Sequence, residues 1–123
     1  MLGNSPLIAF AATTNAERAR AFYEGVLGLP FVSDDPSAIV FDCNGIMLRV
    51  FKVERLTPAA HTVLGWSVAH IEATVDALAA RGVAFERYPR MEQDVRGIWT
   101  SPSGARVAWF KDPDGNVLSL TQF

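Results

Sequence analysis

Two spacings of apolar residues alternate along the chain, and together they predict an order of strands and helices. Residues 7–13 are apolar almost throughout, which predicts a strand that is buried on both faces. Thr14 and Glu17 then form the pattern of a helix capping box, and Asn15 is an alternative N-cap. The next apolar positions recur at the spacing of one stripe of an amphipathic helix: Ala19, Phe22, Tyr23 and Val26.

The remainder of the first half and the whole second half continue this pattern. The turn signal Asn44-Gly45 predicts a hairpin within a set of three short strands at 31–33, 38–42 and 46–52. After a connection at 57–60, a strand, a helix and three more strands are predicted at 62–68, 71–81, 83–87, 106–111 and 117–122. One such half leaves a face of its sheet uncovered, so two halves are expected to pack around a concave surface that suits a small molecule.

Composition and charge narrow the class of protein. The chain has 123 residues, of which 50% are hydrophobic and 20% charged, as expected for one folded domain. Its 11 basic and 13 acidic residues give a net charge of -2, which argues against a nucleic-acid binder. With a single cysteine, no signal peptide and no apolar run of the ~20 residues that a membrane helix needs, we expect a cytoplasmic protein without a membrane partner.

Two motifs at opposite ends of the chain carry a family resemblance. Residues 19–23, Ala-Arg-Ala-Phe-Tyr, and residues 26–29, Val-Leu-Gly-Leu, resemble the first-helix signature of the vicinal oxygen chelate superfamily. Residues 112–116, Asp-Pro-Asp-Gly-Asn, resemble the turn before the last strand of that superfamily, which includes glyoxalase I, the extradiol dioxygenases, and the bleomycin and fosfomycin resistance proteins. The resemblance implies an α+β fold in which two tandem βαβββ modules form a curved mixed sheet around a cavity. It also implies one domain over 1–123, with modules at about 7–55 and 61–123.

The resemblance also identifies the strand positions at which metal-dependent members of the superfamily carry His, Glu or Gln. In this chain those positions are Ile8, Arg49, Ser119 and a residue near Val63, with His61 two residues away. One histidine does not supply the four to six donors that a divalent ion requires, and an arginine beside it repels the ion. The sequence therefore predicts no bound metal and no cofactor.

Other residues with chemical potential have simpler interpretations. His61 and His70 have no partner motif, so we expect structural or solvent-facing side chains. Cys43 lacks a neighbour that lowers a thiol pKa and is expected to be inert. Asp112 and Asp114 suggest calcium only loosely, because no bidentate glutamate follows at the expected position, and they are expected to form a turn.

Arg49 is the most unusual residue, since it interrupts an apolar strand. Three interpretations remain open: an exposed strand edge, a salt bridge to a carboxylate such as Asp94 or Glu92, or, as the resemblance implies, a cavity position at which the guanidinium binds an anion. Aromatic residues on strands are the candidate apolar walls, and Ser119 is a candidate hydroxyl donor. The predicted ligand-binding residues are Phe10, Arg49, Phe51, Trp66, Trp99, Trp109 and Ser119.

Three functions follow as hypotheses. The first is a metal-independent small-molecule-binding protein of the glyoxalase and bleomycin-resistance type, whose ligand is small and aromatic or anionic. The alternative is a glyoxalase-like lyase or isomerase acting on a small carbonyl compound, and the third is a structural or regulatory protein with a vestigial cavity. A homodimer is expected, since pairing covers sheet edges that a chain of this length leaves open.

Overall fold

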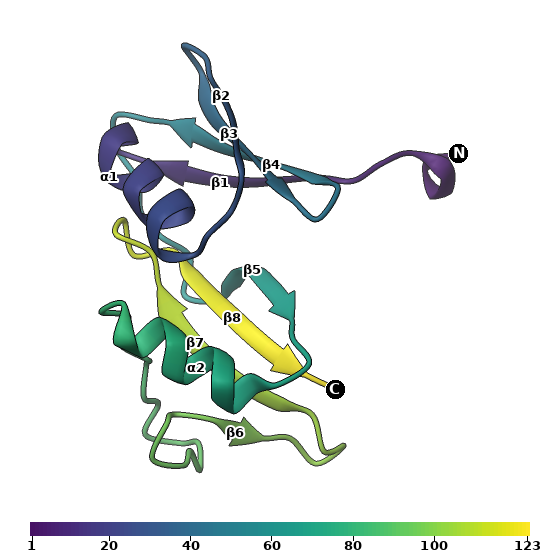
Figure 1. The fold of residues 1–123 in the computed structure, drawn as a ribbon, viewed down its shortest axis with the longest axis vertical. Helices are drawn as coiled ribbons and strands as arrows, with labels where there is room; N and C mark the ends of the chain where they lie inside the picture. The colour runs from purple at the N-terminus through teal and green to yellow at the C-terminus, as the bar shows by residue number, and fades with distance from the viewer. The chain divides into compact units, whose positions relative to one another are not determined.

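The structure, a computed structural model, describes residues 1–123, and the chain divides into two compact units. Unit 1 is Met1–Thr57 and unit 2 is Pro58–Phe123. Each unit holds a four-stranded mixed sheet and a helical segment in the order strand, helix, three strands (Figure 1). The predicted α+β architecture of two tandem βαβββ modules is therefore confirmed.

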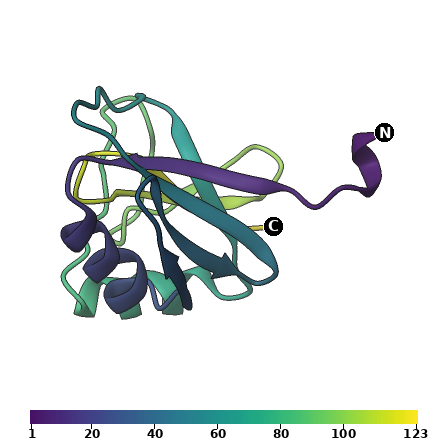
Figure 2. The ribbon, with the colours of Figure 1, turned by 90° about the horizontal axis from the view of Figure 1, so that it is seen from above.

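Unit 1 contains most of its predicted elements close to the expected positions. They are β1 (Ile8–Thr13), α1 (Ala16–Arg20), the π-helical η2 (Ala21–Val26), β2 (Phe31–Asp34), β3 (Ala38–Cys43) and β4 (Ile46–Lys52). The sheet has the order β1-β4-β3-β2, with β1 parallel to β4 and the other pairs antiparallel. The residues before β1, which include the 3₁₀ turn η1 (Leu2–Asn4), extend away from the unit 1 sheet (Figure 2).

Short-range side-chain chemistry sets the turns of unit 1. The side chain of Asn15 accepts a hydrogen bond from the backbone N–H of Arg18 at 3.0 Å, so the alternative N-cap is correct and the Thr14–Glu17 capping box is wrong. Asn44 and Gly45 both have positive φ, 52° and 92°, as a two-residue hairpin turn between β3 and β4 requires.

One face of the unit 1 sheet is covered by the helical segment α1–η2. Ala19 and Tyr23 are buried, and the Tyr23 ring centroid lies 5.7 Å from that of Phe41 on β3. Leu48 and Val50, which point to the same side of β4, are fully buried. Each such side chain stabilises the fold by about 1.5–3 kcal/mol through burial, and this face is the core of the unit.

The opposite face of unit 1 overturns the prediction that the first strand is buried on both sides. Ile8 and Phe10 on β1 are 45% and 51% exposed, whereas Thr13 is buried. The apolar run itself is present, but the helical segment of unit 1 lies on the other face, where Tyr23 contacts Phe41. On this second face Ile8 and Phe10 stay exposed, whereas the smaller Ala38 and Val40 of β3, which pair with Phe51 and Arg49, are buried. A continuous apolar strand therefore does not mark a doubly covered position here, and the exposed side chains need another explanation.

Unit 2 repeats the arrangement with a longer loop. Its elements are β5 (Thr62–Ser67), α2 (Ile71–Ala80), β6 (Trp99–Thr100), β7 (Arg106–Lys111) and β8 (Val117–Gln122). The sheet order is β5-β8-β7-β6, with β5 parallel to β8. Ile71 and Val75 of α2 are buried, and the Ile71 N–H donates to the side chain of Gln122 at 2.9 Å. No helix in the chain is long and apolar enough to cross a membrane.

The strand predicted at 83–87 is wrong, and the short β6 takes its place in the sheet. Phe85 makes only an isolated bridge to Phe110. Beyond it, the side chain of Gln93 accepts from Tyr88 N–H at 2.8 Å and donates to Glu86 C=O at 2.9 Å, so these backbone groups are not available to a strand ladder. The same Gln93 amide also bonds Gly97 C=O at 2.8 Å, which closes residues 86–98 into a defined loop.

Candidate functional site

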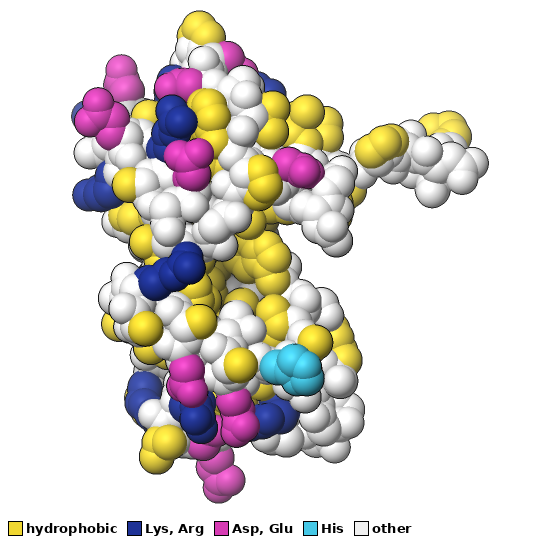
Figure 3. Space-filling view, viewed as in Figure 1, with side chains coloured by type: hydrophobic (Ala, Val, Ile, Leu, Met, Phe, Trp, Pro, Cys, Tyr) yellow, Lys and Arg dark blue, Asp and Glu magenta, His cyan; other side chains and the backbone are white.

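The uncovered face of the unit 1 sheet carries large apolar side chains around one arginine. We call it the open face of unit 1, and it consists of Ile8, Phe10, Met47, Arg49 and Phe51. Strand pairing places Ile8 beside Met47 and Phe10 beside Arg49, and the Phe10 and Phe51 ring centroids are 5.4 Å apart. Hydrophobic side chains are visible on unit 1 next to the point where the N-terminal segment leaves it (Figure 3). Large exposed apolar patches often mark interaction sites or ligand-binding grooves.

Arg49 has a protein carboxylate partner, but not one of those predicted. Its Nη2 donates to Oδ2 of Asp35 at 3.2 Å, so the suggested partners Asp94 and Glu92 are wrong. The Arg49 guanidinium carbon lies 5.8 Å from the centre of the Phe51 ring, within the range of a cation–π contact. The Asp35 bond is the one hydrogen bond that Arg49 makes, which leaves most of its five N–H donors available.

The turn between β2 and β3 holds Asp35 in place. Its Oδ1 accepts the backbone N–H groups of Ser37 and Ala38, each at 2.8 Å. These two bonds, with a smaller contribution from Arg49, hold the pKa of the Asp35 carboxyl below its ordinary value of 3.8 despite partial desolvation. Asp35 is therefore ionised at neutral pH, and its second oxygen is aimed at Arg49.

Three aromatic rings, those of Tyr88, Trp99 and Trp109, lie together on one face of unit 2, which we call the open face of unit 2. The Trp109 ring centroid lies 6.0 Å from that of Trp99 and 5.5 Å from that of Tyr88, which meets it edge-on. Ser119 pairs with Trp109 across β7 and β8 and is 7% exposed. On its other side Ser119 lies against Gly65, where an added Cβ would be 2.8 Å from the serine Oγ. The glycine therefore permits Ser119 to lie on this face between β5 and β7.

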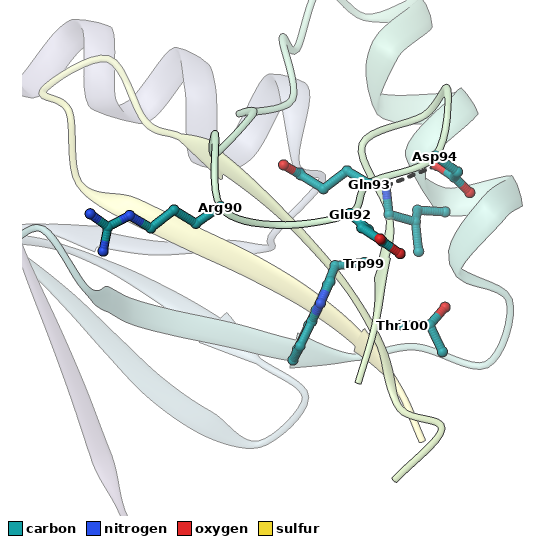
Figure 4. A pocket seen from close by; sticks show the side chains of 7 residues that line it. Arg90, Glu92, Gln93, Asp94, Trp99 and Thr100 are labelled. Carbon is teal, nitrogen blue, oxygen red and sulfur yellow. Dashed lines mark hydrogen bonds between the residues drawn. The ribbon is translucent and has the colours of Figure 1, made fainter. Parts of the chain in front are cut away.

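Two cavities border these unit 2 rings. One, of about 330 Å³, is mostly apolar and is lined by Ala60, His61, Thr62, Tyr88, Met91, Trp109 and Val117. The other, of about 520 Å³, is polar and lies between the 86–98 loop and β6, next to Trp99. Figure 4 shows Arg90 pointing away from the other side chains that line this second cavity. In that view Arg90 lies on one side of the Trp99 indole, and Glu92 and Thr100 lie on the other side.

The structure separates Trp66 from the other predicted site residues of unit 2. In the parallel β5–β8 pair, Trp66 lies beside Leu120 and Gly65 lies beside Ser119. Because side chains alternate along a strand, Trp66 points to the side of Leu120, which is 3% exposed, and not to the side of Ser119 and Trp109. Trp66 is thus placed with the packing face of the sheet.

The donor set of the chain does not fit a metal ion. Within neither unit does a group of three or more His, Cys, Asp or Glu side chains come together. Asp112, which the sequence loosely suggested as a calcium ligand, has both carboxylate oxygens engaged. Oδ1 accepts the N–H groups of Asp114 and Asn116 at 2.9 Å each, and Oδ2 accepts from the Asn116 side-chain amide at 2.7 Å. Its oxygens therefore stabilise the turn, and no metal-dependent step is assigned to these residues.

The histidines and the cysteine are placed without catalytic partners. His70 is the N-cap residue of α2 and makes no capping bond through its side chain. His61 is exposed at the rim of the apolar cavity. Burial raises the pKa of the Cys43 thiol, with a further contribution from Asp42, so little of it is the nucleophilic thiolate at neutral pH.

Sequence reasoning missed two residues that shape these faces. Asp35 was part of a turn signal, Asp-Pro-Ser, and an aspartate before Pro and Ser is the usual cap of such a turn, but nothing in the pattern connects it to Arg49. Tyr88 lies at the start of the polar stretch before Pro89 and gave no periodic signal. Both become visible only when strand register and loop path are known.

The fold is that of an α+β protein built from two βαβββ modules. Comparison with known proteins shows to which family it belongs. Residues 8–120 match the model of the Glyoxalase/Bleomycin resistance protein/Dioxygenase superfamily, and the chain belongs to this superfamily. Comparison with curated proteins gives no match.

Solved structures with the same fold include members of different activity. A lactoylglutathione lyase from Agrobacterium tumefaciens has 21% identity and a TM-score of 0.72, over 98% of this chain and 95% of that one. A glyoxalase family protein from Enterococcus faecalis has 19% identity and a TM-score of 0.76, over 98% and 99% of the two chains. A fosfomycin resistance protein from Listeria monocytogenes has 13% identity and a TM-score of 0.74, over 98% and 93%. At these identities the likeness concerns the fold, which hosts many functions.

Proposed function

We propose that this protein binds a small molecule, aromatic or anionic in character, without the aid of a metal ion. The observation that carries the proposal is Arg49 on the open face of unit 1, with N–H donors to spare among exposed apolar side chains. A guanidinium presents its donors in a planar fork that matches an anionic oxygen pair, and the neighbouring Phe10 and Phe51 rings suit an apolar or aromatic body.

The open face of unit 2 supports the aromatic part of the proposal. Trp99, Trp109 and Tyr88 present ring surfaces beside two wide-open hollows, and the more apolar hollow has a volume of about 330 Å³. The Ser119 hydroxyl adds one polar group beside Trp109. Trp66 is not included, because it points to the opposite side of the sheet.

A thermal-shift screen in the presence of a chelator tests the proposal. A ligand that binds only the folded state, at about 100 times its Kd, stabilises the protein by about 2.7 kcal/mol and raises the melting temperature by several degrees. We expect small aromatic carboxylates to give such shifts and the uncharged alcohols and amides of the same ring systems to give none. Shifts that appear only when a divalent metal is added would contradict metal independence, and a screen without hits would favour a vestigial cavity.

An assay of turnover distinguishes the proposed binding function from the alternative, a glyoxalase-like lyase or isomerase. In this chain the strand positions that would supply metal donors hold Ile8, Arg49 and Ser119, and no acidic or histidine cluster replaces them. We therefore expect no turnover of 2-oxoaldehyde adducts with or without added divalent metal. Metal-stimulated turnover would contradict the binding proposal and support the enzymatic alternative.

We also propose that the protein works as a homodimer. Each sheet ends in two edge strands, β1 and β2 in unit 1 and β5 and β6 in unit 2. Unpaired strand edges favour association with another chain, and a symmetric pair is the commonest outcome. Exposed apolar residues near the β1 edge, including Leu7 at 68% exposure, add to the surface that a second copy would cover.

A further inference from the structure

Asp35 is the carboxylate that bonds Arg49, and each of its two oxygens has a separate role. Oδ1 is fixed by the Ser37 and Ala38 N–H groups at 2.8 Å each, and Oδ2 accepts from Arg49 at 3.2 Å. Because the turn holds the carboxylate, the carboxylate in turn holds the guanidinium near the Phe51 ring. Arg49 is thus oriented before any ligand arrives, which lowers the entropy cost of binding.

The charges around Arg49 nearly cancel. Lys52 pairs with Asp34 and also donates to the backbone C=O of Asp35 at 2.8 Å, so two cations and two carboxylates lie together at this end of the sheet. The Arg49 and Asp35 side chains keep 26% and 38% of their surface exposed. The surroundings therefore do not supply the surplus positive charge that a multiply charged ligand needs.

This balance discriminates between anions of different charge. The cost of removing an ion from water grows with the square of its charge, whereas its attraction to a fixed set of protein charges grows only in proportion. Near a cluster that is neutral overall, the desolvation free energy of a dianion is therefore larger, and its attraction to the protein charges does not rise enough to offset it. The desolvation free energy of a singly charged, planar carboxylate is smaller, and this group still fits the remaining N–H donors of Arg49.

We propose that Asp35 is a positioning and specificity-determining residue that restricts the anion site at Arg49 to monoanionic carboxylates and disfavours phosphate dianions. This inference rests on the proposed function, since it needs an anion to bind at Arg49. It goes further by assigning the ligand class and by giving Asp35 a part in selecting it. A role confined to capping the β2–β3 turn does not affect the choice between two anions.

The test compares two probes that share a phenyl ring, phenylacetate and phenyl phosphate, by calorimetric titration above the second phosphate pKa of about 6. In the variant Asp35→Asn the amide oxygen still accepts from Ser37 and Ala38, but the charge is gone. The matched control is Asp42→Asn, since Asp42 accepts the Gly45 N–H at 2.8 Å in the neighbouring turn, whereas the ion-pair partner of Arg49 is Asp35.

We expect the wild-type protein to bind phenylacetate at least about tenfold more tightly than phenyl phosphate, and Asp35→Asn to bring the ratio close to one, a change of about 1.4 kcal/mol. Asp42→Asn is expected to keep the wild-type ratio. If both probes bind and Asp35→Asn leaves their ratio unchanged, Asp35 is only a turn cap and the inference is wrong. If neither probe binds the wild-type protein, the proposed function fails, and the inference fails with it.

Discussion

Replacing Arg49 by leucine separates a ligand-binding arginine from a structural one. The variant Arg49→Leu removes the guanidinium from the open face of unit 1 and keeps an apolar side chain of moderate size. Losing one partner of a buried charge pair costs about 2–5 kcal/mol of binding free energy. Arg49 keeps 26% of its side-chain surface exposed, so we expect the lower end, which corresponds to about a thirtyfold loss of affinity for an anionic ligand.

The same substitution is expected to affect the unliganded fold much less. The Arg49–Asp35 pair is partly exposed, and such pairs contribute little to stability. Asp35 also keeps its two bonds from Ser37 and Ala38 when the arginine is gone. The melting temperature without ligand should therefore change by no more than a few degrees, while calorimetric titration with an aromatic carboxylate shows the loss of affinity.

The control for this experiment is Arg55→Leu, which removes the same charge from an exposed position of unit 1 outside the sheet. We expect it to retain wild-type affinity and stability. Two results would refute the reasoning. An unchanged affinity in Arg49→Leu would place the anion elsewhere, and a large fall of its melting temperature without ligand would make the salt bridge to Asp35 structural.

Three further predictions concern stability and assembly. Asp112→Ala removes the acceptor for the N–H groups of Asp114 and Asn116 and for the buried Asn116 side-chain amide. Urea unfolding should therefore show a free energy of unfolding lower by about 2–4 kcal/mol. A change within experimental error would contradict this role of Asp112 in the turn. Because the pKa of Asp35 is lowered in the fold, its contribution to stability is present above the unfolded value of 3.8 and is lost as the pH falls through the lower folded value. Thermal melts at decreasing pH should therefore show a shallower fall for Asp35→Asn than for the wild type, and parallel curves would count against it. Light scattering should give twice the 13.4 kDa of one chain, and a mass near 13.4 kDa would exclude the dimer.

Much of the fold was predictable because it depends on short-range chemistry. The Asn44-Gly45 turn needs two residues that tolerate positive φ, and the sequence pair supplies them. The periodic apolar residues of α2, including Ile71 and Val75, are buried as their spacing predicts. The Asp112–Asn116 segment folds into its turn through bonds among its own residues.

The errors arose where structure depends on distant partners. Apolar residues at Ile8 and Phe10 show that a strand forms, but not whether an element covers its second face. The region 83–87 looks like a strand, but the Gln93 side chain bonds Glu86 C=O and the N–H of Tyr88 just beyond it, so only a bridge to β7 remains there. A charged residue in a strand indicates that a partner is required, but only the register of β3 and β4 and the path of the turn between β2 and β3 place Asp35, rather than Asp94, beside Arg49.

The central claim is that this chain binds a small aromatic or anionic molecule without a metal ion. Its most direct test is a calorimetric titration of phenylacetate into wild-type protein that has been dialysed against a chelator, with elemental analysis of the same sample. The account predicts saturable binding by protein that holds far less than one transition-metal ion per chain. Binding that disappears on chelation and returns with zinc, nickel, iron or manganese would contradict it.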